Sequence, residues 1–212
     1  MWRKLMIFLL ILIGVFLICS PFFKEVIINY MSRHVKPTEL TPSQLEENNR
    51  SSANFDYNAI KPPSVIETLK GSTSFDKNAV IGQITIKSIH LKLPILKGMT
   101  NQNLLVGATT MREDQKMGEG NYPLAGHHMK NQSLLFSPLM NIKQGAIVEL
   151  TDLKKTYTYK VFEIEIISEN DIDVIQETED KQLTLITCDK ATETNKRLMV
   201  KAKLKKVEAN AS

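Results

Sequence analysis

An uncharged apolar run near the N-terminus constrains this chain more than any other feature of the sequence. From Leu5 to Phe23, nineteen consecutive residues carry no charge. Coiled as a helix, they would measure roughly 28 Å, about the thickness of the hydrocarbon core of a bilayer. The small residues Cys19 and Ser20 are followed by Pro21 and two phenylalanines, which make a poor signal-peptidase site. The run therefore predicts an uncleaved transmembrane signal anchor.

The charges around the apolar run predict its orientation. Arg3 and Lys4 precede it without an acid, which favours an N-terminus in the cytoplasm, although Lys24, Arg33 and Lys36 behind it weaken the bias. We expect a single-pass protein of the cell membrane whose body lies outside the cytoplasm.

The net charge of +4 does not describe the body of the protein. Of the 27 Lys and Arg residues, three lie within residues 1–24, which leaves 24 against 23 acids in the remainder. A nearly neutral body offers no electrostatic basis for binding nucleic acid, so we expect none.

The two cysteines have different expected surroundings. Cys19 belongs to the apolar run and Cys188 lies far along the body, so we do not expect them to form a disulfide. An unpaired thiol outside the cytoplasm is unusual and is a candidate reactive group.

The body is predicted to be mainly β. The segment after the anchor looks like a stalk. Pro37, Pro42 and the polar run 44–52 leave it too little apolar material for a core. The predicted parts are a cytoplasmic tip and anchor (1–24), a stalk (25–53), an arm with a short helix near 64–69 (54–79), the body (80–207) and a tail (208–212).

Short alternating patterns predict eight strands, which favour a closed or nearly closed barrel with one or two short helices. The longest pattern changes phase near Val161, as a β-bulge would cause. A helix is expected over 133–140, although Pro138 makes it imperfect, and the polar segment 168–181 is long enough to be a functional loop. The strands are expected at 80–86, 91–96, within 103–110, and at 121–126, 146–150, 156–167, 183–188 and 197–204.

Cys188 ends one predicted strand, and Arg197 begins the next. If the two strands pair through the intervening loop, the guanidinium comes to lie beside the thiol, where a positive charge favours the nucleophilic thiolate. Without further context, a small apolar filler at a strand end would be the preferred interpretation of Cys188, and the rest of the chain shifts the balance towards a reactive group. Among the histidines, His127 and His128 follow the small residues Ala125-Gly126, which permit the close approach of a substrate or another chain segment.

Three short blocks carry a family resemblance: Ala125-Gly126-His127, Leu185-Ile186-Thr187-Cys188 and the downstream Arg197. Together with an N-terminal anchor, they resemble the sortases, the cysteine transpeptidases of Gram-positive surfaces, and most of all class A. The resemblance covers roughly 78–207 and implies an eight-stranded mixed β-barrel. It also implies that His127, Cys188 and Arg197 are catalytic and that His128 is a bystander.

The resemblance implies a reaction and its partners. Cys188 would attack the Thr–Gly bond of a Leu-Pro-x-Thr-Gly (LPXTG) sorting signal on a surface protein, and His127 would protonate the departing amine. Arg197 would donate to the oxyanion or to a substrate carbonyl. The acyl group would then pass to an amine of a peptidoglycan precursor, and the reaction requires no cofactor.

In the family, the sorting signal lies in a groove beside the fourth and seventh strands. This implies substrate contacts at Ala125, Val174, Ile175, Ile186 and Thr187, although plain core packing of the three aliphatic residues is an equal alternative. Some class A members bind calcium through the loop after the third strand. Here that loop interleaves cations and amides with its acids, so we expect no metal site.

Two other interpretations stay open at the level of the sequence. One is a hydrolytic cysteine endopeptidase that passes the acyl group to water. The other is a membrane-tethered β-domain without catalytic activity, in which the thiol is incidental.

Overall fold

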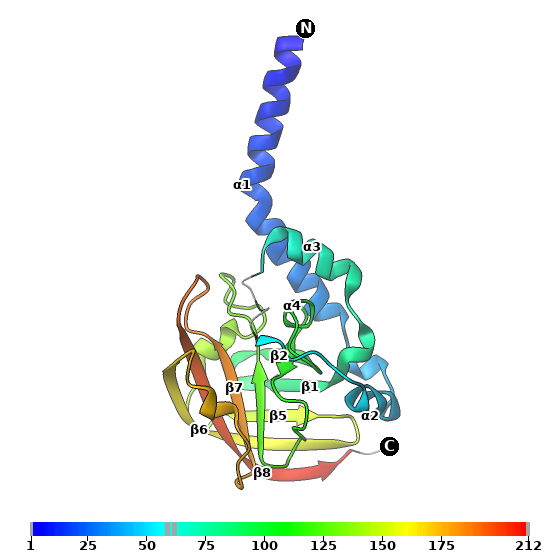
Figure 1. Cartoon of the computed structure of the whole chain (residues 1–212), viewed down its shortest axis with the longest axis vertical. Helices are drawn as coiled ribbons and strands as arrows, with labels where there is room; N and C mark the ends of the chain where they lie inside the picture. Colours follow the sequence, from blue (N-terminus) through cyan, green and yellow to red (C-terminus); the bar gives the residue numbers. More distant parts are fainter. Residues whose placement is uncertain (1, 58–59, 61–62, 211–212) are drawn as a thin grey trace.

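In the computed structural model, the backbone is described for residues 2–57, 60 and 63–210, and the side chains of 16–21, 65–66 and 72–74 lie outside the description. The expectation for Cys19 therefore falls outside the described side chains. Eight strands close into a barrel in the order β1-β2-β3-β4-β7-β8-β6-β5 (Figure 1). They are β1 (Val80–Ile86), β2 (Leu91–Leu96), β3 (Ala108–Thr110), β4 (Asn121–Ala125), β5 (Ile147–Thr151), β6 (Lys155–Ser168), β7 (Gln182–Cys188) and β8 (Lys196–Ala209).

The barrel is mixed, as the resemblance implies. The pairs β2–β3 and β4–β7 are parallel, whereas the remaining neighbours in the barrel are antiparallel. The predicted phase change in the long strand is confirmed, since the register of β6 against β8 shifts between Val161 and Glu163. The prediction of a mixed eight-stranded barrel is therefore confirmed.

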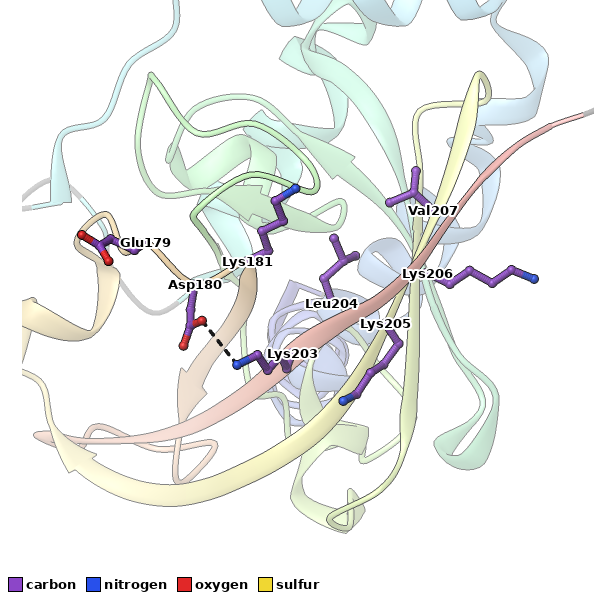
Figure 2. Close-up of a pocket in the computed structure, with 8 residues that line it drawn as sticks. All are labelled: Glu179, Asp180, Lys181, Lys203, Leu204, Lys205, Lys206 and Val207. Carbon is purple, nitrogen blue, oxygen red and sulfur yellow. Dashed lines mark hydrogen bonds and ion pairs between the residues drawn. The ribbon is translucent and has the colours of Figure 1, made fainter.

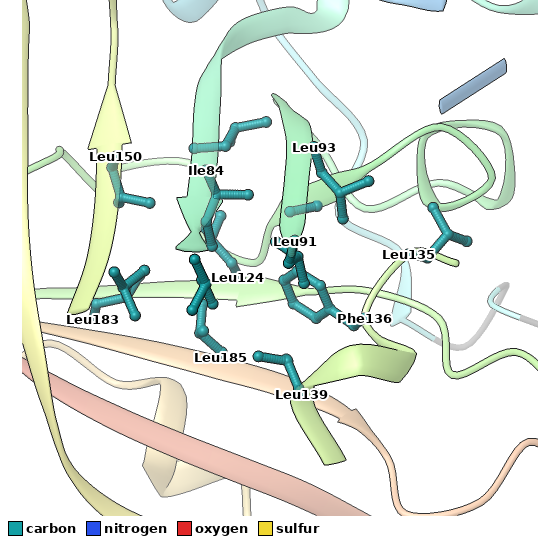
Figure 3. Packing of buried hydrophobic residues seen from close by; sticks show 14 of the residues in the cluster. Ile84, Leu91, Leu93, Leu124, Leu135, Phe136, Leu139, Leu150, Leu183 and Leu185 are labelled. Carbon is teal, nitrogen blue, oxygen red and sulfur yellow. The ribbon is translucent and has the colours of Figure 1, made fainter. Parts of the chain in front are cut away.

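The alternating pattern of the strands fills the interior of the barrel. Leu183 and Leu185 of β7 are completely buried, as are Leu124 of β4 and Leu150 of β5. Figure 3 shows these side chains converging with Phe136, which reaches the core from the segment after β4. Since a period of two leaves every second residue of a strand on the outside, the neighbours of these core residues are available to build a site.

Short helices connect the strands and cover the barrel, and one long helix projects from it (Figure 1). Among the residues that the structure describes, no helix combines the length and the hydropathy that a membrane crossing requires. The α-helices are α1 (Trp2–His34), α2 (Pro42–Arg50), α3 (Val65–Ser74) and α4 (Asn101–Leu104). The 3-10 turns are η1 (Pro37–Glu39), η3 (Lys77–Ala79), η4 (Lys87–Ile89), η5 (Ser137–Asn141) and η6 (Ile172–Ile175).

The expected stalk packs on the barrel. Ile28 and Met31 of α1 and Leu45 of α2 are buried in the same core cluster as the strands. The expectation that the segment from Pro37 to Ser52 has too little apolar material for a core is therefore wrong, because the single side chain of Leu45 suffices where the barrel supplies the rest of the cluster. The domain boundaries themselves stay a prediction.

A local signal for α2 was present in the sequence. Thr41 caps the helix by accepting a hydrogen bond from the backbone of Gln44, whose side chain accepts one from the Thr41 backbone, and Pro42 occupies the first turn. Asn48 then fixes the helix to the barrel by donating to the carbonyl of Val80 at 2.7 Å.

The helix expected over 133–140 does not form. Leu135 has a φ of 49°, outside the right-handed helical region, and its backbone pairs with His128 in an isolated bridge. The 3-10 turn η5 begins at Ser137, with Pro138 in its first turn. A proline and a left-handed residue within eight positions exclude a continuous α-helix.

Leu45→Ala tests whether α2 belongs to the fold. Leu45 is 1% exposed, and removing its buried side chain should lower the free energy of unfolding by about 2–5 kcal/mol. Urea denaturation of the full chain measures this loss. Glu47→Ala on the exposed face of the same helix is the matched control, and equal stability of the two variants would show that α2 does not pack on the barrel.

Candidate active site

The pairing of β4, β7 and β8 gathers at one end of the barrel the segments that carry the three predicted catalytic residues. The β7–β8 register places Cys188 directly opposite Arg197. In the parallel β4–β7 pair, Ala125 lies opposite Ile186, and the N–H of Gly126 continues the ladder by donating to the Ile186 carbonyl at 3.1 Å. His127 follows at once and therefore emerges beside the end of β7.

The alternation of side chains along the strands separates His127 from its neighbour. His127 and Cys188 each lie two residues beyond the paired Ala125 and Ile186, so continued alternation directs both to the face that Ala125 and Ile186 occupy. His128 has a different partner, since its Nδ1 lies 2.9 Å from the carbonyl oxygen of Cys188, to which it can only donate. The arrangement favours His127 over His128 as the partner of the thiol.

Gly126 permits a close approach that fixes this end of the barrel. A Cβ atom at Gly126 would lie 2.5 Å from Cγ of Phe136, whose ring is completely buried. The N–H of Phe136 donates to the His127 carbonyl at 3.0 Å. The small residue before His127 therefore lets an aromatic ring support the backbone that carries the imidazole.

Thr187 contributes to the same support. Its side chain is 2% exposed, and its hydroxyl donates to the Gly126 carbonyl at 2.7 Å. Neighbouring residues on a strand point to opposite faces, so Thr187 faces away from Ile186 and Cys188. Its predicted contact with substrate stays a prediction, and this inward position does not favour it.

Burial depresses the basicity of His127. Removal of the imidazole from water lowers the pKa of His127 to about 4, and the positive charge of Lys24 lowers it further while Glu67 opposes the shift. Lys24 lies on α1 and Glu67 on α3, so the N-terminal helices shape the electrostatics of a residue that follows β4. No local sequence signal indicated this proximity.

Cys188 is shifted in the opposite direction. Burial raises the pKa of the Cys188 thiol, the charge of Arg197 lowers it, and Asp189 and Glu169 oppose Arg197. At neutral pH the imidazole and the thiol are therefore both uncharged in the free protein. Thiolate and imidazolium together therefore form a minority state.

Arg197 is held in place by groups of two loops. Its guanidinium donates to a carboxylate oxygen of Glu169 at 2.9 Å and to the carbonyls of Thr194 and Lys196, each at 2.9 Å. A guanidinium has five N–H donors, so these contacts do not exhaust its capacity. Arg197 can thus be fixed by the protein and still donate to an oxygen near Cys188.

An apolar cluster lies outside the barrel core, next to Cys188 in the chain. Ala125 and Ile186 are buried in it, and Val174 and Ile175 pack against it. Four of the five predicted substrate contacts therefore gather in this outer apolar cluster. The cluster has further members that the sequence did not indicate, because no local signal brings their separate segments together: Leu104, Met111, Met99 and Ile60.

A hollow on the outer surface near the start of β7 lies apart from this site. Figure 2 shows it between the segment before β7 and the second half of β8, where Asp180 and Lys203 form an ion pair. Lys203 pairs with Gln182, six residues before Cys188, which corresponds to roughly 20 Å along a strand. Among the described residues, no group of three or more His, Cys, Asp or Glu side chains is placed to hold a metal ion.

A thiol directly opposite a guanidinium on paired strands, at one end of a closed β-barrel, fits the class of cysteine-dependent acyl-transfer enzymes. The Sortase domain model matches residues 84–205 of the chain. The chain is 45% identical over 208 residues to Sortase A of Listeria monocytogenes, covering 98% of this chain and 94% of the relative. It is 37% identical over 210 residues to Sortase A of Streptococcus agalactiae, covering 96% and 85% of the two chains.

The crystal structure of Listeria monocytogenes sortase A matches with a TM-score of 0.62 and 50% identity, covering 63% of this chain and 92% of that one. The chain belongs to the sortase family, and sortases are cysteine transpeptidases.

The depressed pKa of His127 predicts a loss of stability in acid. An unfolded histidine titrates near ~6.5 and native His127 near 4, so the unfolded chain binds more protons between these values. The free energy of unfolding therefore falls as the pH drops from ~6.5 towards 4. Denaturation of wild type and His127→Gln at pH 7 and at pH 4.5 should show a smaller fall in the variant.

His90→Asn is the matched control, because His90 is exposed and Asn tolerates its left-handed backbone. An ordinary histidine pKa for His127, measured by NMR, would contradict this prediction.

Proposed function

We propose that the protein is a class A sortase that cleaves LPXTG-type sorting signals between Thr and Gly and transfers the surface protein to a peptidoglycan precursor. The observation that carries this proposal is the register that pairs Cys188 with Arg197 and pairs Ala125, two residues before His127, with Ile186. Membership of the sortase family supports it, and the groove, the signal and the acceptor follow from the family resemblance.

In the first half of the reaction, the sulfur of Cys188 attacks the carbonyl carbon of the signal Thr. The electron pair of the C=O moves to oxygen, where Arg197 donates hydrogen bonds to the oxyanion. His127, protonated at the expense of the thiol, then gives its proton to the departing glycine amine. Collapse of the intermediate breaks the Thr–Gly bond and leaves a thioester on Cys188.

In the second half, an amine of the peptidoglycan precursor attacks the thioester. Neutral His127 accepts a proton from this amine, which makes the nitrogen nucleophilic. The new amide bond forms as the C–S bond breaks, and the proton returns to the thiolate. The lowered pKa keeps the imidazole neutral and so able to accept a proton, but it also makes His127 a weaker base than an ordinary histidine.

The outer apolar cluster is the proposed wall for the signal peptide. Ala125 and Ile186 form its floor two residues before His127 and Cys188, and Val174 and Ile175 cover it from the β6–β7 loop. An apolar side chain at the first position of the signal would gain free energy by entering this cluster.

The proposed location is the outer face of the cell membrane, with the N-terminus in the cytoplasm. The uncharged run of 5–23 supports an anchor there. Residues such as Leu5, Phe8 and Leu10 expose more than half of their surface on the part of α1 that extends beyond the barrel, and a bilayer would remove that apolar surface from water.

The acceptor of the acyl group distinguishes transfer from hydrolysis. Incubation with a Leu-Pro-x-Thr-Gly peptide and triglycine, followed by mass spectrometry, should give the ligated product in place of the free acid. Hydrolysis that triglycine does not divert would indicate the endopeptidase, and the absence of a thioester on Cys188 would indicate the tethered domain without activity.

Substitutions at the three polar positions should remove turnover to different degrees. Cys188→Ala should abolish it because no nucleophile remains, and His127→Ala should abolish nearly all of it. Arg197→Lys should lower kcat/KM by roughly 100-fold or more, since a lysine cannot reproduce the planar fork. The rate of peptide cleavage measures all three, with circular dichroism as the check on folding. Full activity in His127→Ala with loss in His128→Ala would contradict the assignment.

A further inference from the structure

Arg112 has a charged side chain that is largely buried. It does not belong to the proposed catalytic residues. It lies in the loop between β3 and β4, and only 13% of its side chain is exposed. Its guanidinium donates to Asp114 in its own loop (Nε, 3.1 Å), to the Ile175 carbonyl (Nη1, 3.2 Å) and to the Glu177 carboxylate. Arg112 thus joins the β3–β4 loop to the β6–β7 loop.

The base of Arg112 is rigid. The side-chain oxygen of Gln115 accepts hydrogen bonds from the backbone N–H groups of Met111 (3.0 Å) and Arg112 (2.8 Å), and its amide nitrogen donates to the Pro123 carbonyl of β4 at 2.9 Å. Gln115 is 5% exposed. The guanidinium is therefore projected from a turn that is fixed to the barrel.

A second buried side chain holds the same part of the β6–β7 loop from the other side. The amide nitrogen of Asn121 donates to the carbonyls of Val174 and Gln176, each at 2.9 Å, and its oxygen accepts from Thr184 at 2.7 Å. Asn121 is 1% exposed and belongs to β4. The segment 174–177 is therefore hydrogen-bonded to Asn121 on one side and to Arg112 on the other.

The other described contacts of this segment are apolar. It begins within the 3-10 turn η6, whose first residue, Ile172, is 62% exposed. Val174 and Ile175 pack against the outer apolar cluster, which includes Ala125 and Ile186. Segments with few buried contacts open at low free-energy cost, so the two polar anchors decide how closely this wall is held.

We propose that Arg112 is a positioning residue that holds Val174 and Ile175 against Ala125 and Ile186, so that the groove selects an apolar residue at the start of the signal peptide. The inference rests on the proposed function, because it assigns the wall to the peptide groove. Arg112 acts through the loop and touches no reacting atom.

Steady-state kinetics of Arg112→Gln test this role. A hydrogen-bonded charge that anchors a loop is expected to change affinity by roughly tenfold, so KM should rise about tenfold while kcat stays within about threefold. The preference for Leu over Ala at the first position of the peptide should fall by a similar factor. Arg112→Lys should recover part of this loss, since it restores the charge without the planar fork.

Lys116→Gln is the matched control in the same loop. Lys116 is 70% exposed and pairs with Glu119 in its own loop, so KM and the Leu preference should stay at wild-type values. Unchanged KM and unchanged Leu preference in Arg112→Gln would overturn the proposal, as would a loss confined to kcat.

Hydrogen exchange gives a readout that does not depend on turnover. The backbone amides of 172–177 should exchange faster in Arg112→Gln than in wild type, whereas those of β7 should not change. Should Arg112→Gln fail to fold, Glu177→Gln removes one anchor from the exposed end of the same contact and should accelerate exchange in the same segment. Unchanged exchange in a folded variant would overturn the proposal. A wild-type protein that cleaves no signal peptide would instead refute the proposed function, and the exchange result would still decide whether Arg112 holds the loop.

Discussion

The parallel pairing of β4 with β7 is the constraint on which the rest of the site depends. Its register, extended by the hydrogen bond from Gly126 to Ile186, places His127 beside the strand that ends in Cys188. The antiparallel partner β8 then returns Arg197 to the same end. Because each side-chain direction follows from strand alternation, a slip of one residue would exchange His127 for His128 and Cys188 for Thr187.

Burial is unfavourable to the charged pair that the chemistry requires, and the surroundings offset it only in part. Removal from water keeps both His127 and Cys188 neutral, and Arg197 supplies the positive charge that favours the thiolate. The same removal from water strengthens the interaction of Arg197 with a developing oxyanion. Burial therefore lowers the population of the thiolate–imidazolium state and at the same time strengthens the interaction of Arg197 with the oxyanion.

The sequence predicted the features that short-range patterns determine. Alternation and turn residues gave the strands and the bulge near Val161, and the three signature blocks gave the family and the residues near Cys188. The turn around Leu135 was mistaken for a helix, because the left-handed backbone there depends on pairing with His128. The packing of the segment 25–53 and the anchoring role of Arg112 depend on contacts between distant parts of the chain. Contacts between residues far apart in the chain leave no local pattern from which the sequence could predict them.

The contact between α1 and the loop after His127 would determine where the thiol works if 5–23 is the anchor that we propose. Glu25 accepts a hydrogen bond from the Asn131 backbone at 3.2 Å, which ties the base of α1 to the loop that follows His127. With 5–23 as the proposed anchor, Glu25 lies at the bilayer surface, and the catalytic end of the barrel lies there with it. An acceptor amine carried by a lipid would then reach the thioester by lateral diffusion along the membrane. Its effective concentration at the thioester would be set by confinement to the membrane surface and not by its concentration in solution.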